Sequence, residues 1–148
     1  MKSRTIIRWI LRLLLGICFV WAAASKFQDP LAFAAAVASY EVISGIWARG
    51  VVLVLPWLEL WVGIGLMIPG LKRGSAWVVW FLLLGFIGLH LSAWWRGLNI
   101  ECGCFGAMGM LSGYGMLFAR NSLLLLGATI LIFLEIIRHR EQKAGGSH

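Results

Sequence analysis

The sequence predicts an all-α polytopic membrane protein, a bundle of four transmembrane helices with a short interfacial helix between the first two spans. The chain has 148 residues, is 61% hydrophobic and carries only six acidic residues, so a water-soluble domain cannot bury all its apolar surface. Four apolar blocks approach the roughly 20 residues that a membrane helix needs. The basic residues stand at the edges of these blocks, which is typical of membrane topology and not of a nucleic-acid-binding surface.

The predicted spans are residues 6–24, 51–68, 75–95 and 121–137. No long linker separates them, so we expect one integral membrane domain covering residues 1–148. Small residues within the spans are expected to let helices approach closely. The glycines in question are Gly63, Gly65, Gly85, Gly88 and Gly127.

The first block also has the shape of a secretory signal peptide. Basic residues precede an apolar stretch that ends in WAAAS at positions 21–25, of which positions 22–25 are small residues. Cleavage there would leave three spans and would not change the rest of the topology. The family resemblance described below favours a retained first helix.

The distribution of Lys and Arg predicts the orientation. With four spans both chain ends share one side, which then holds nine basic residues against four on the other. The nine are Lys2, Arg4, Arg8, Arg12, Lys72, Arg73, Arg138, Arg140 and Lys143. We therefore expect a multi-pass protein of the bacterial inner membrane with cytoplasmic termini. The connection that carries Cys102 and Cys104 would face the oxidising periplasm.

A short helix is expected between the first two spans. Asp29 is a good helix cap and Pro30 fits the first helical turn, so residues 31–40 are predicted to form an Ala-rich helix at the outer interface. Two roles remain open for this helix. It is either a plain connection or a lid over a site.

The pair Cys102-Gly103-Cys104 is the main chemical feature of the sequence. Two cysteines one residue apart can close a small, strained disulfide ring, and such bonds tend to be labile or catalytic. The short loop also makes the pair a poor stabiliser of the fold. Two alternatives stay open, namely capture of a soft metal ion such as Cu(I) and an inert local staple. Only three Cys and three His are present, so no closed structural metal site is predicted.

Three residues within the spans are candidates for a redox or proton-relay role. Cys18, in the outer third of the first span, is either a resolving thiol or a packing residue. His90 is expected at a similar depth in the third span, where it either accepts a thiol proton or bonds a neighbouring helix.

Glu59 follows Pro56 near the middle of the second span and needs a partner in the membrane. Arg12 is predicted at about the same depth, so an Arg12–Glu59 ion pair is one interpretation. A proton relay or quinone-site residue is the other. Glu135, near the inner end of the last span, is expected to pair locally with Arg138 and Arg140.

Several short motifs recur in one known family. With them, the chain resembles the MauE/DoxX-like family of redox-associated membrane proteins over nearly its whole length. The motifs are Ala24-Ser25-Lys26-Phe27 followed by Asp29-Pro30, Tyr40 at the end of the short helix, residues 55–60 (LPWLEL), Cys102-Gly103-Cys104-Phe105-Gly106, and Arg120-Asn121 opening the fourth span.

The resemblance implies a four-helix bundle that supports periplasmic thiol–disulfide chemistry beside a thioredoxin-like partner. Cys102 and Cys104 are then the catalytic residues, and distant relatives imply a membrane quinone as candidate cofactor. The residues expected to support the site are Lys26, Asp29, Tyr40, Phe105, Arg120 and Asn121. Interface anchoring is the simpler role for Lys26 and Asp29, and packing is that of Phe105.

The sequence therefore predicts a thiol–disulfide oxidoreductase of the membrane. Its expected partners are the lipid bilayer and a periplasmic thioredoxin-fold protein or disulfide-bearing client, with no nucleic acid. Two alternatives from other classes remain. One is a soft-metal-ion transport protein, and the other is a non-catalytic anchor of an oxidoreductase complex.

Overall fold

The computed structural model describes residues 2–41, 45–97 and 114–145, and every regular element within these ranges is an α-helix. The helices are α1 (Lys2–Gln28), α2 (Pro30–Ser39), α3 (Ile46–Gly65), α4 (Lys72–Trp95) and α5 (Tyr114–Gly145). All except α2 are long and apolar enough to cross a membrane. The prediction of an all-α bundle with four spans and a short extra helix is confirmed.

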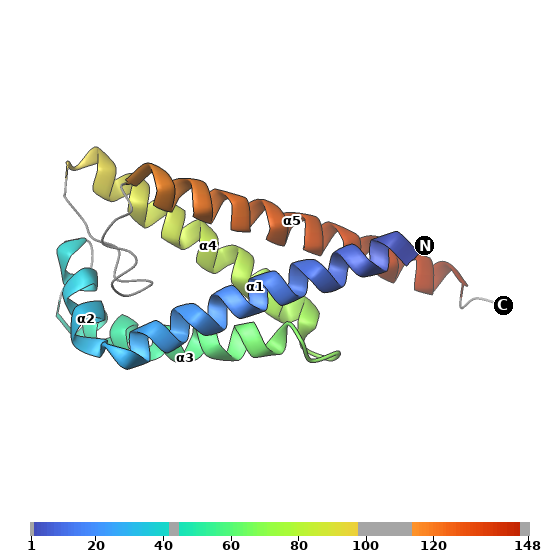
Figure 1. The fold of residues 1–148 in the computed structure, drawn as a ribbon, viewed down its shortest axis with the longest axis horizontal. Helices are drawn as coiled ribbons and strands as arrows, with labels where there is room; N and C mark the ends of the chain where they lie inside the picture. Colours follow the sequence, from blue (N-terminus) through green and yellow to red (C-terminus); the bar gives the residue numbers. More distant parts are fainter. Residues whose placement is uncertain (1, 42–44, 98–113, 146–148) are drawn as a thin grey trace.

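The helices form an elongated bundle in which α4 and α5 lie side by side and α1 packs along α3 (Figure 1). The N-terminal part of α1 also contacts α5. Both chain ends lie at one end of the bundle, as an even number of spans requires, and α2 lies at the other. The core between the long helices consists of Leu15, Phe19, Val62, Leu66, Ala76, Val79, Leu83, Ala128, Leu131 and Ile132.

Helix α2 begins as the sequence predicts. The Asp29 carboxylate accepts a hydrogen bond from the backbone N–H of Ala32 at 2.9 Å, and Pro30 occupies the first helical position. The helix packs on α3 and on the end of α1. Phe33 is its buried residue, at 4% exposure. This contact holds α2 against the bundle at the end opposite the chain termini.

Glycines of α3 allow close contacts with α1 and with α4. A Cβ added to Gly63 would lie 2.9 Å from Cγ2 of Val20 and 3.0 Å from the carbonyl oxygen of Gly16. A Cβ on Gly65 would collide with the Ser75 hydroxyl of α4. The predicted close approach is therefore confirmed at Gly63 and Gly65.

The same prediction is wrong for two glycines of α4. A Cβ on Gly85 or Gly88 would meet nothing within 4 Å, because both positions face away from the neighbouring helices. Gly127 makes only an ordinary contact, since its Cβ would lie 3.6 Å from Leu11.

The helices extend beyond the apolar blocks that predicted them. The first, predicted over residues 6–24, covers Lys2–Gln28, and the fourth begins at Tyr114 instead of residue 121. Backbone hydrogen bonding continues the helix into polar or small residues that a hydropathy pattern does not count. Arg120 and Asn121 consequently lie inside α5 and do not open it.

Candidate functional site

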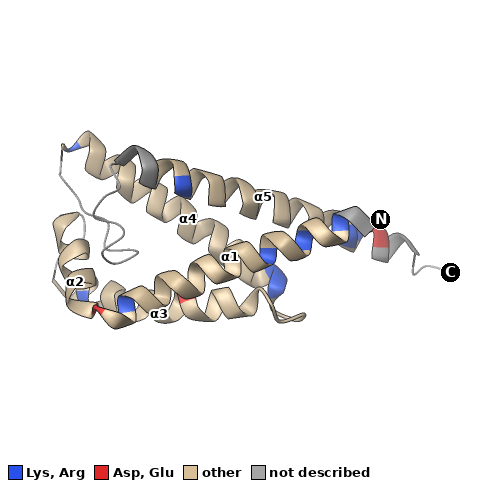
Figure 2. Cartoon of the chain, in the orientation of Figure 1, with Lys and Arg blue, Asp and Glu red and all other residues tan. Residues whose placement is uncertain are grey.

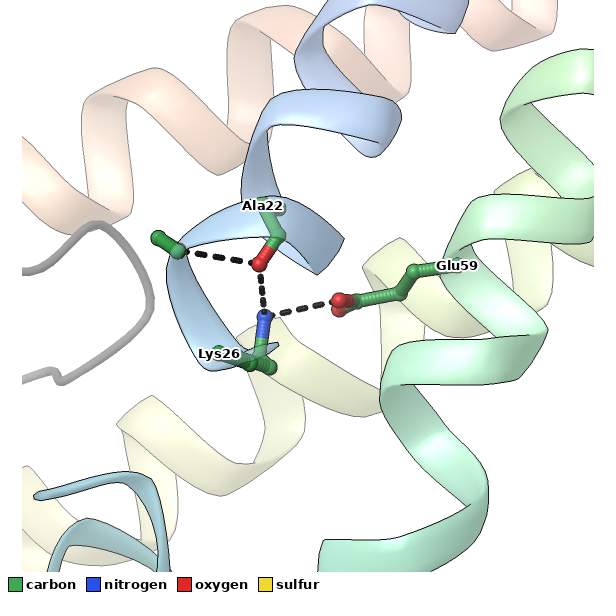
Figure 3. A network of polar contacts seen from close by, with 4 residues as sticks. Ala22, Lys26 and Glu59 are labelled. Carbon is green, nitrogen blue, oxygen red and sulfur yellow. Dashed lines mark hydrogen bonds and ion pairs between the residues drawn. The ribbon is translucent and has the colours of Figure 1, made fainter. Parts of the chain in front are cut away.

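A buried ion pair between α1 and α3 is the centre of the candidate site. Nζ of Lys26 lies 2.7 Å from Oε2 of Glu59, and each side chain is only 1% exposed. Figure 3 shows the same ammonium group donating to the carbonyl oxygen of Ala22, at 3.2 Å. The Ser25 hydroxyl also donates to that carbonyl, at 2.9 Å. The expectation that Glu59 has a partner is confirmed, and the partner is Lys26.

The direction of side chains on α1 explains why Lys26 reaches Glu59. Side chains of an α-helix lean toward its N-terminus, so the long Lys26 chain runs back along α1 to the level of Ala22. Helices α1 and α3 are antiparallel, with Gly16 next to Gly63. Residues after Gly16 on α1 therefore lie beside residues before Gly63 on α3, and this register brings Glu59 within reach of the Lys26 side chain.

Arg12, the predicted partner of Glu59, pairs with Glu135 of α5 instead. The prediction was wrong because it placed the midpoints of the first two spans at one depth. Arg12 and Lys26 lie on opposite sides of the Gly16 contact, about 21 Å apart along α1 at about 1.5 Å per residue. Since the Arg12 side chain also leans toward the N-terminus, it points away from Glu59.

The outcome also corrects two simpler roles. Glu135 was expected to pair locally with Arg138 and Arg140, but its ion-pair partner comes from another helix. Of the two roles expected for Lys26, support of the site and interface anchoring, the second is wrong, because Lys26 is 2% exposed and belongs to the protein interior.

Phe33 of α2 covers the ammonium group from a third side. Its ring centroid lies 5.3 Å from Nζ of Lys26, within the range of a cation–π interaction. The ion pair is thus enclosed by α1, α3 and α2. The structure favours the covering role for α2 over that of a plain connection, because its one buried side chain closes this site.

A small cavity of about 30 Å³ adjoins the ion pair. It brings together five predicted site residues from three helices, although they are far apart in the sequence. The lining consists of Cys18, Phe19, Ala22, Lys26, Glu59, Leu83, Phe86, Arg120, Asn121 and Leu124. A cation, a carboxylate, a thiol and an amide therefore share one space inside an apolar bundle.

Arg120 and Asn121 enter this cavity from α5. Asn121 is 5% exposed, so it belongs to the interior. The cavity wall carries two cations, Lys26 and Arg120, and one carboxylate, Glu59. The charged groups of the cavity wall therefore carry one more positive than negative charge.

His90 and Tyr40 form a second contact next to the cavity. Their rings meet edge to face with centroids 6.1 Å apart. His90 is 5% exposed, and its Nδ1 lies 2.6 Å from the carbonyl oxygen of Phe86, a cavity residue. A carbonyl only accepts, so Nδ1 carries the proton in this bond. The imidazole therefore lies about one helical turn from the cavity and does not line it.

The remaining predicted residues lie apart from this cluster. Asp29 caps α2 on the exposed surface. Cys102, Cys104 and Phe105 lie outside the described residues, in the connection between Trp95 at the end of α4 and Tyr114 at the start of α5.

Sequence reasoning missed two residues of the site. One is Phe33, the single aromatic residue of α2, whose place in an otherwise Ala-rich helix was the available signal. The other is Gly16, which sets the register of α1 on α3. The sequence around Gly16 gives no comparable signal, because only the packing of the helices shows that Gly16 contacts Gly63.

Comparison with known proteins agrees with the motifs. The family model described as methylamine utilisation protein MauE matches residues 4–134. The MauE of Paracoccus denitrificans is 37% identical over 98 residues, which are 66% of this chain and 53% of the relative. For Paracoccus versutus MauE the identity is 37% over 133 residues, 86% of this chain and 70% of the relative.

A third relative, the MauE of Methylophilus methylotrophus, is 31% identical over 115 residues, 75% of this chain and 59% of its own length. The chain thus spans between 53% and 70% of the length of these relatives. No solved structure matches it. Because the family model covers most of a chain with four candidate membrane spans, the chain belongs to the MauE family of multi-pass membrane proteins.

Proposed function

We propose that this chain is a thiol–disulfide redox protein in which Cys102 and Cys104 exchange a disulfide with a thioredoxin-fold partner or a client protein. The observation that carries the proposal is the Cys-Gly-Cys sequence in the connection between two membrane spans. A disulfide closed over one intervening residue is strained, and strained disulfides exchange readily.

The exchange is a balanced two-electron reaction. A partner thiolate attacks one sulfur of the Cys102–Cys104 disulfide, a mixed disulfide forms, and the other sulfur leaves as a thiolate. The second partner thiol then attacks the mixed disulfide, which closes the partner's own disulfide and releases this chain as a dithiol. Two electrons and two protons pass from the partner to this chain, and the reverse direction uses the same steps.

The buried cluster supports this chemistry by supplying charge and a proton path. Lys26, Arg120 and Glu59 line one cavity, so charged groups able to hold or pass a proton lie together there. Glu59 is the carboxylate able to exchange a proton there. A cavity of about 30 Å³ has room for about one or two water molecules and none for a quinone ring, so it suits proton transfer.

The biological process that we propose is taken from the relatives, and the proposed orientation in the membrane is taken from the distribution of Lys and Arg. The curated relatives are named for methylamine utilisation. We propose that this chain serves the same process, with a disulfide-bearing protein of that process as client. The positive-inside rule supports cytoplasmic termini and a periplasmic Cys pair.

Thiol trapping of the purified full-length protein across a graded dithiol–disulfide buffer tests the proposal. We expect Cys102 and Cys104 to be alkylated together under reducing conditions and protected together under oxidising conditions. The Cys104→Ser variant should accumulate a mixed disulfide with a thioredoxin-fold protein through Cys102. The matched control is Cys18→Ser, which should leave the protection of the pair unchanged.

Three results would contradict the proposal. In the first, the pair stays oxidised at every physiological potential. In the second, the reduced protein binds Cu(I) stoichiometrically, Cys102→Ser abolishes the binding, and no mixed disulfide forms, which would favour metal handling. Full function of the Cys102→Ser/Cys104→Ser variant in cells would instead favour a non-catalytic anchor.

A further inference from the structure

A second pocket lies at the opposite end of the bundle, where α4 begins and α5 approaches its end. Its volume is about 100 Å³, more than three times that of the cavity beside Lys26. The lining consists of Lys72, Arg73, Glu135, Arg138 and His139. The proposed redox chemistry uses none of these residues, so a different role is needed to account for the pocket.

The pocket has an excess of positive charge. Its one carboxylate, Glu135, is paired with Arg12, and that pair is 6% and 7% exposed. Lys72 lies within electrostatic range of Arg12 and Arg138, and also of Arg8, which is only 8% exposed. Several cations thus surround a carboxylate that already has its partner. An additional anion would relieve their mutual repulsion.

The basic residues gather where both chain termini lie. Figure 2 shows this end of the bundle carrying Lys and Arg on successive turns of α1 and at the start of α4. Lys72 is also the first residue of the candidate span Lys72–Trp95. The pocket is therefore at the depth where an apolar helix meets the polar layer of a membrane.

Apolar surface continues from the pocket along the same two helices. Trp77 and Phe81 of α4 are 45% and 62% exposed, and Phe133 and Ile136 of α5 are 63% and 37% exposed. A small free anion would gain nothing from contact with this apolar surface. A molecule with an anionic head and acyl chains contacts both the basic pocket and the apolar helix faces.

We propose that this pocket binds the phosphate group of an anionic phospholipid, with Lys72 and Arg138 as its main cationic contacts. The phosphate group supplies the negative charge that the pocket lacks. Arg73 and His139, which also line the pocket, add further donors. The lipid would tie α4 to α5 at the end of the bundle where both chain termini lie.

The test uses the purified full-length protein and phosphatidylglycerol, phosphatidylcholine and inorganic phosphate as separate probes. Native mass spectrometry counts retained lipid, and a titration of each probe in detergent gives its affinity. The test variant is Lys72→Gln/Arg138→Gln. The matched control is Arg4→Gln/Arg140→Gln, which removes the same charge at exposed positions of the same end, outside the pocket.

We expect the native protein and the control to retain one phosphatidylglycerol in preference to phosphatidylcholine. The test variant should bind phosphatidylglycerol about 10- to 30-fold more weakly, since two headgroup contacts are lost. Saturable binding of inorganic phosphate with the same dependence on Lys72 and Arg138, but no preference for phosphatidylglycerol, would replace the lipid by a free phosphate and overturn the lipid assignment.

The proposal also fails if the control loses affinity as much as the test variant, because binding would then reflect general surface charge. It fails equally if neither probe binds the native protein. Circular dichroism of both double variants checks that the helical bundle is intact. The residues replaced are half-buried or exposed, so folding is expected to be retained.

Discussion

Among the residues that the structure describes, two buried ion pairs attach α1 to its neighbours, and their surroundings differ. Lys26–Glu59 joins α1 to α3 in an enclosed space below α2, with both side chains 1% exposed. Arg12–Glu135 joins α1 to α5 beside the basic pocket at the end where the termini lie, with side chains 6% and 7% exposed. In each pair the cation comes from α1 and the carboxylate from another helix.

The difference concerns what remains when one partner is lost. Glu135 has Lys72 and Arg138 beside it as substitute cations, so the second pair has a reserve. The enclosed pair adjoins a cavity with Cys18 and Asn121 and is capped by the Phe33 ring. A buried ion pair is weak evidence for stability, and charges inside a membrane are usually functional. We infer that the Lys26–Glu59 pair serves chemistry, whereas Arg12–Glu135 fixes the position of α1.

The largest effect is expected from removing one partner of the enclosed pair. Glu59→Leu leaves the Lys26 ammonium buried without its carboxylate, which should lower the free energy of unfolding by about 3–5 kcal/mol. The double variant Lys26→Met/Glu59→Leu removes both charges and should recover most of this loss. Denaturant titration in detergent, followed by circular dichroism, measures the three stabilities.

Disulfide exchange of the double variant gives the functional half of that prediction. If Glu59 relays protons, the refolded double variant should exchange slowly and lose its pH dependence. Native exchange rates and pH profile in a stable double variant would show that the pair is merely structural. Equal stability losses in the single and double variants would contradict the ion-pair argument itself.

A smaller effect is expected at the second pair. Arg12→Gln should lower the free energy of unfolding by about 1–2 kcal/mol, because Lys72 and Arg138 remain close to Glu135. Glu135→Gln should have the larger effect of the two, since it leaves Arg12 among like charges. The same denaturant titration measures both. A loss at Arg12→Gln as large as that of Glu59→Leu would remove the distinction between the pairs.

The fold was predictable because block length and hydrophobicity dictate membrane helices. The cap of α2 was predictable too, since Asp29 and Pro30 act through neighbours in the sequence. Helix ends were harder to predict. Helix α5 begins at Tyr114, before the apolar block at residue 121, and a hydropathy pattern does not include these first turns of the helix.

The sequence predicted which residues belong to the site, but it did not predict which charged residues form ion pairs with one another. Cys18, Lys26, Glu59, Arg120 and Asn121 were all candidates, and they line one cavity. Pairing depends on how far one helix is shifted along another, which span centres do not reveal. The contact that sets this shift joins two glycines that are distant in sequence. The role of Cys102 and Cys104 remains a prediction from sequence.

An effect similar in size to that of Arg12→Gln is expected at the glycine contact that separates the two pairs along α1. Gly63→Ala places a methyl group 2.9 Å from Val20 and 3.0 Å from the Gly16 carbonyl, so we expect a loss of about 1–2 kcal/mol as α3 shifts. The matched control is Gly85→Ala on α4, where nothing lies within 4 Å. It should gain about 0.5–1 kcal/mol from helix propensity.

Combined variants show which ion pair the glycine contact positions. A shift of α3 should disturb Lys26–Glu59 and leave Arg12–Glu135 in place. In the background of Lys26→Met/Glu59→Leu, Gly63→Ala should therefore lower the free energy of unfolding by less than it does in the native protein, whereas in the background of Arg12→Gln it should lower it by the same amount. Additivity in both combinations, measured by denaturant titration, would show that the glycine contact does not set the register of the enclosed pair.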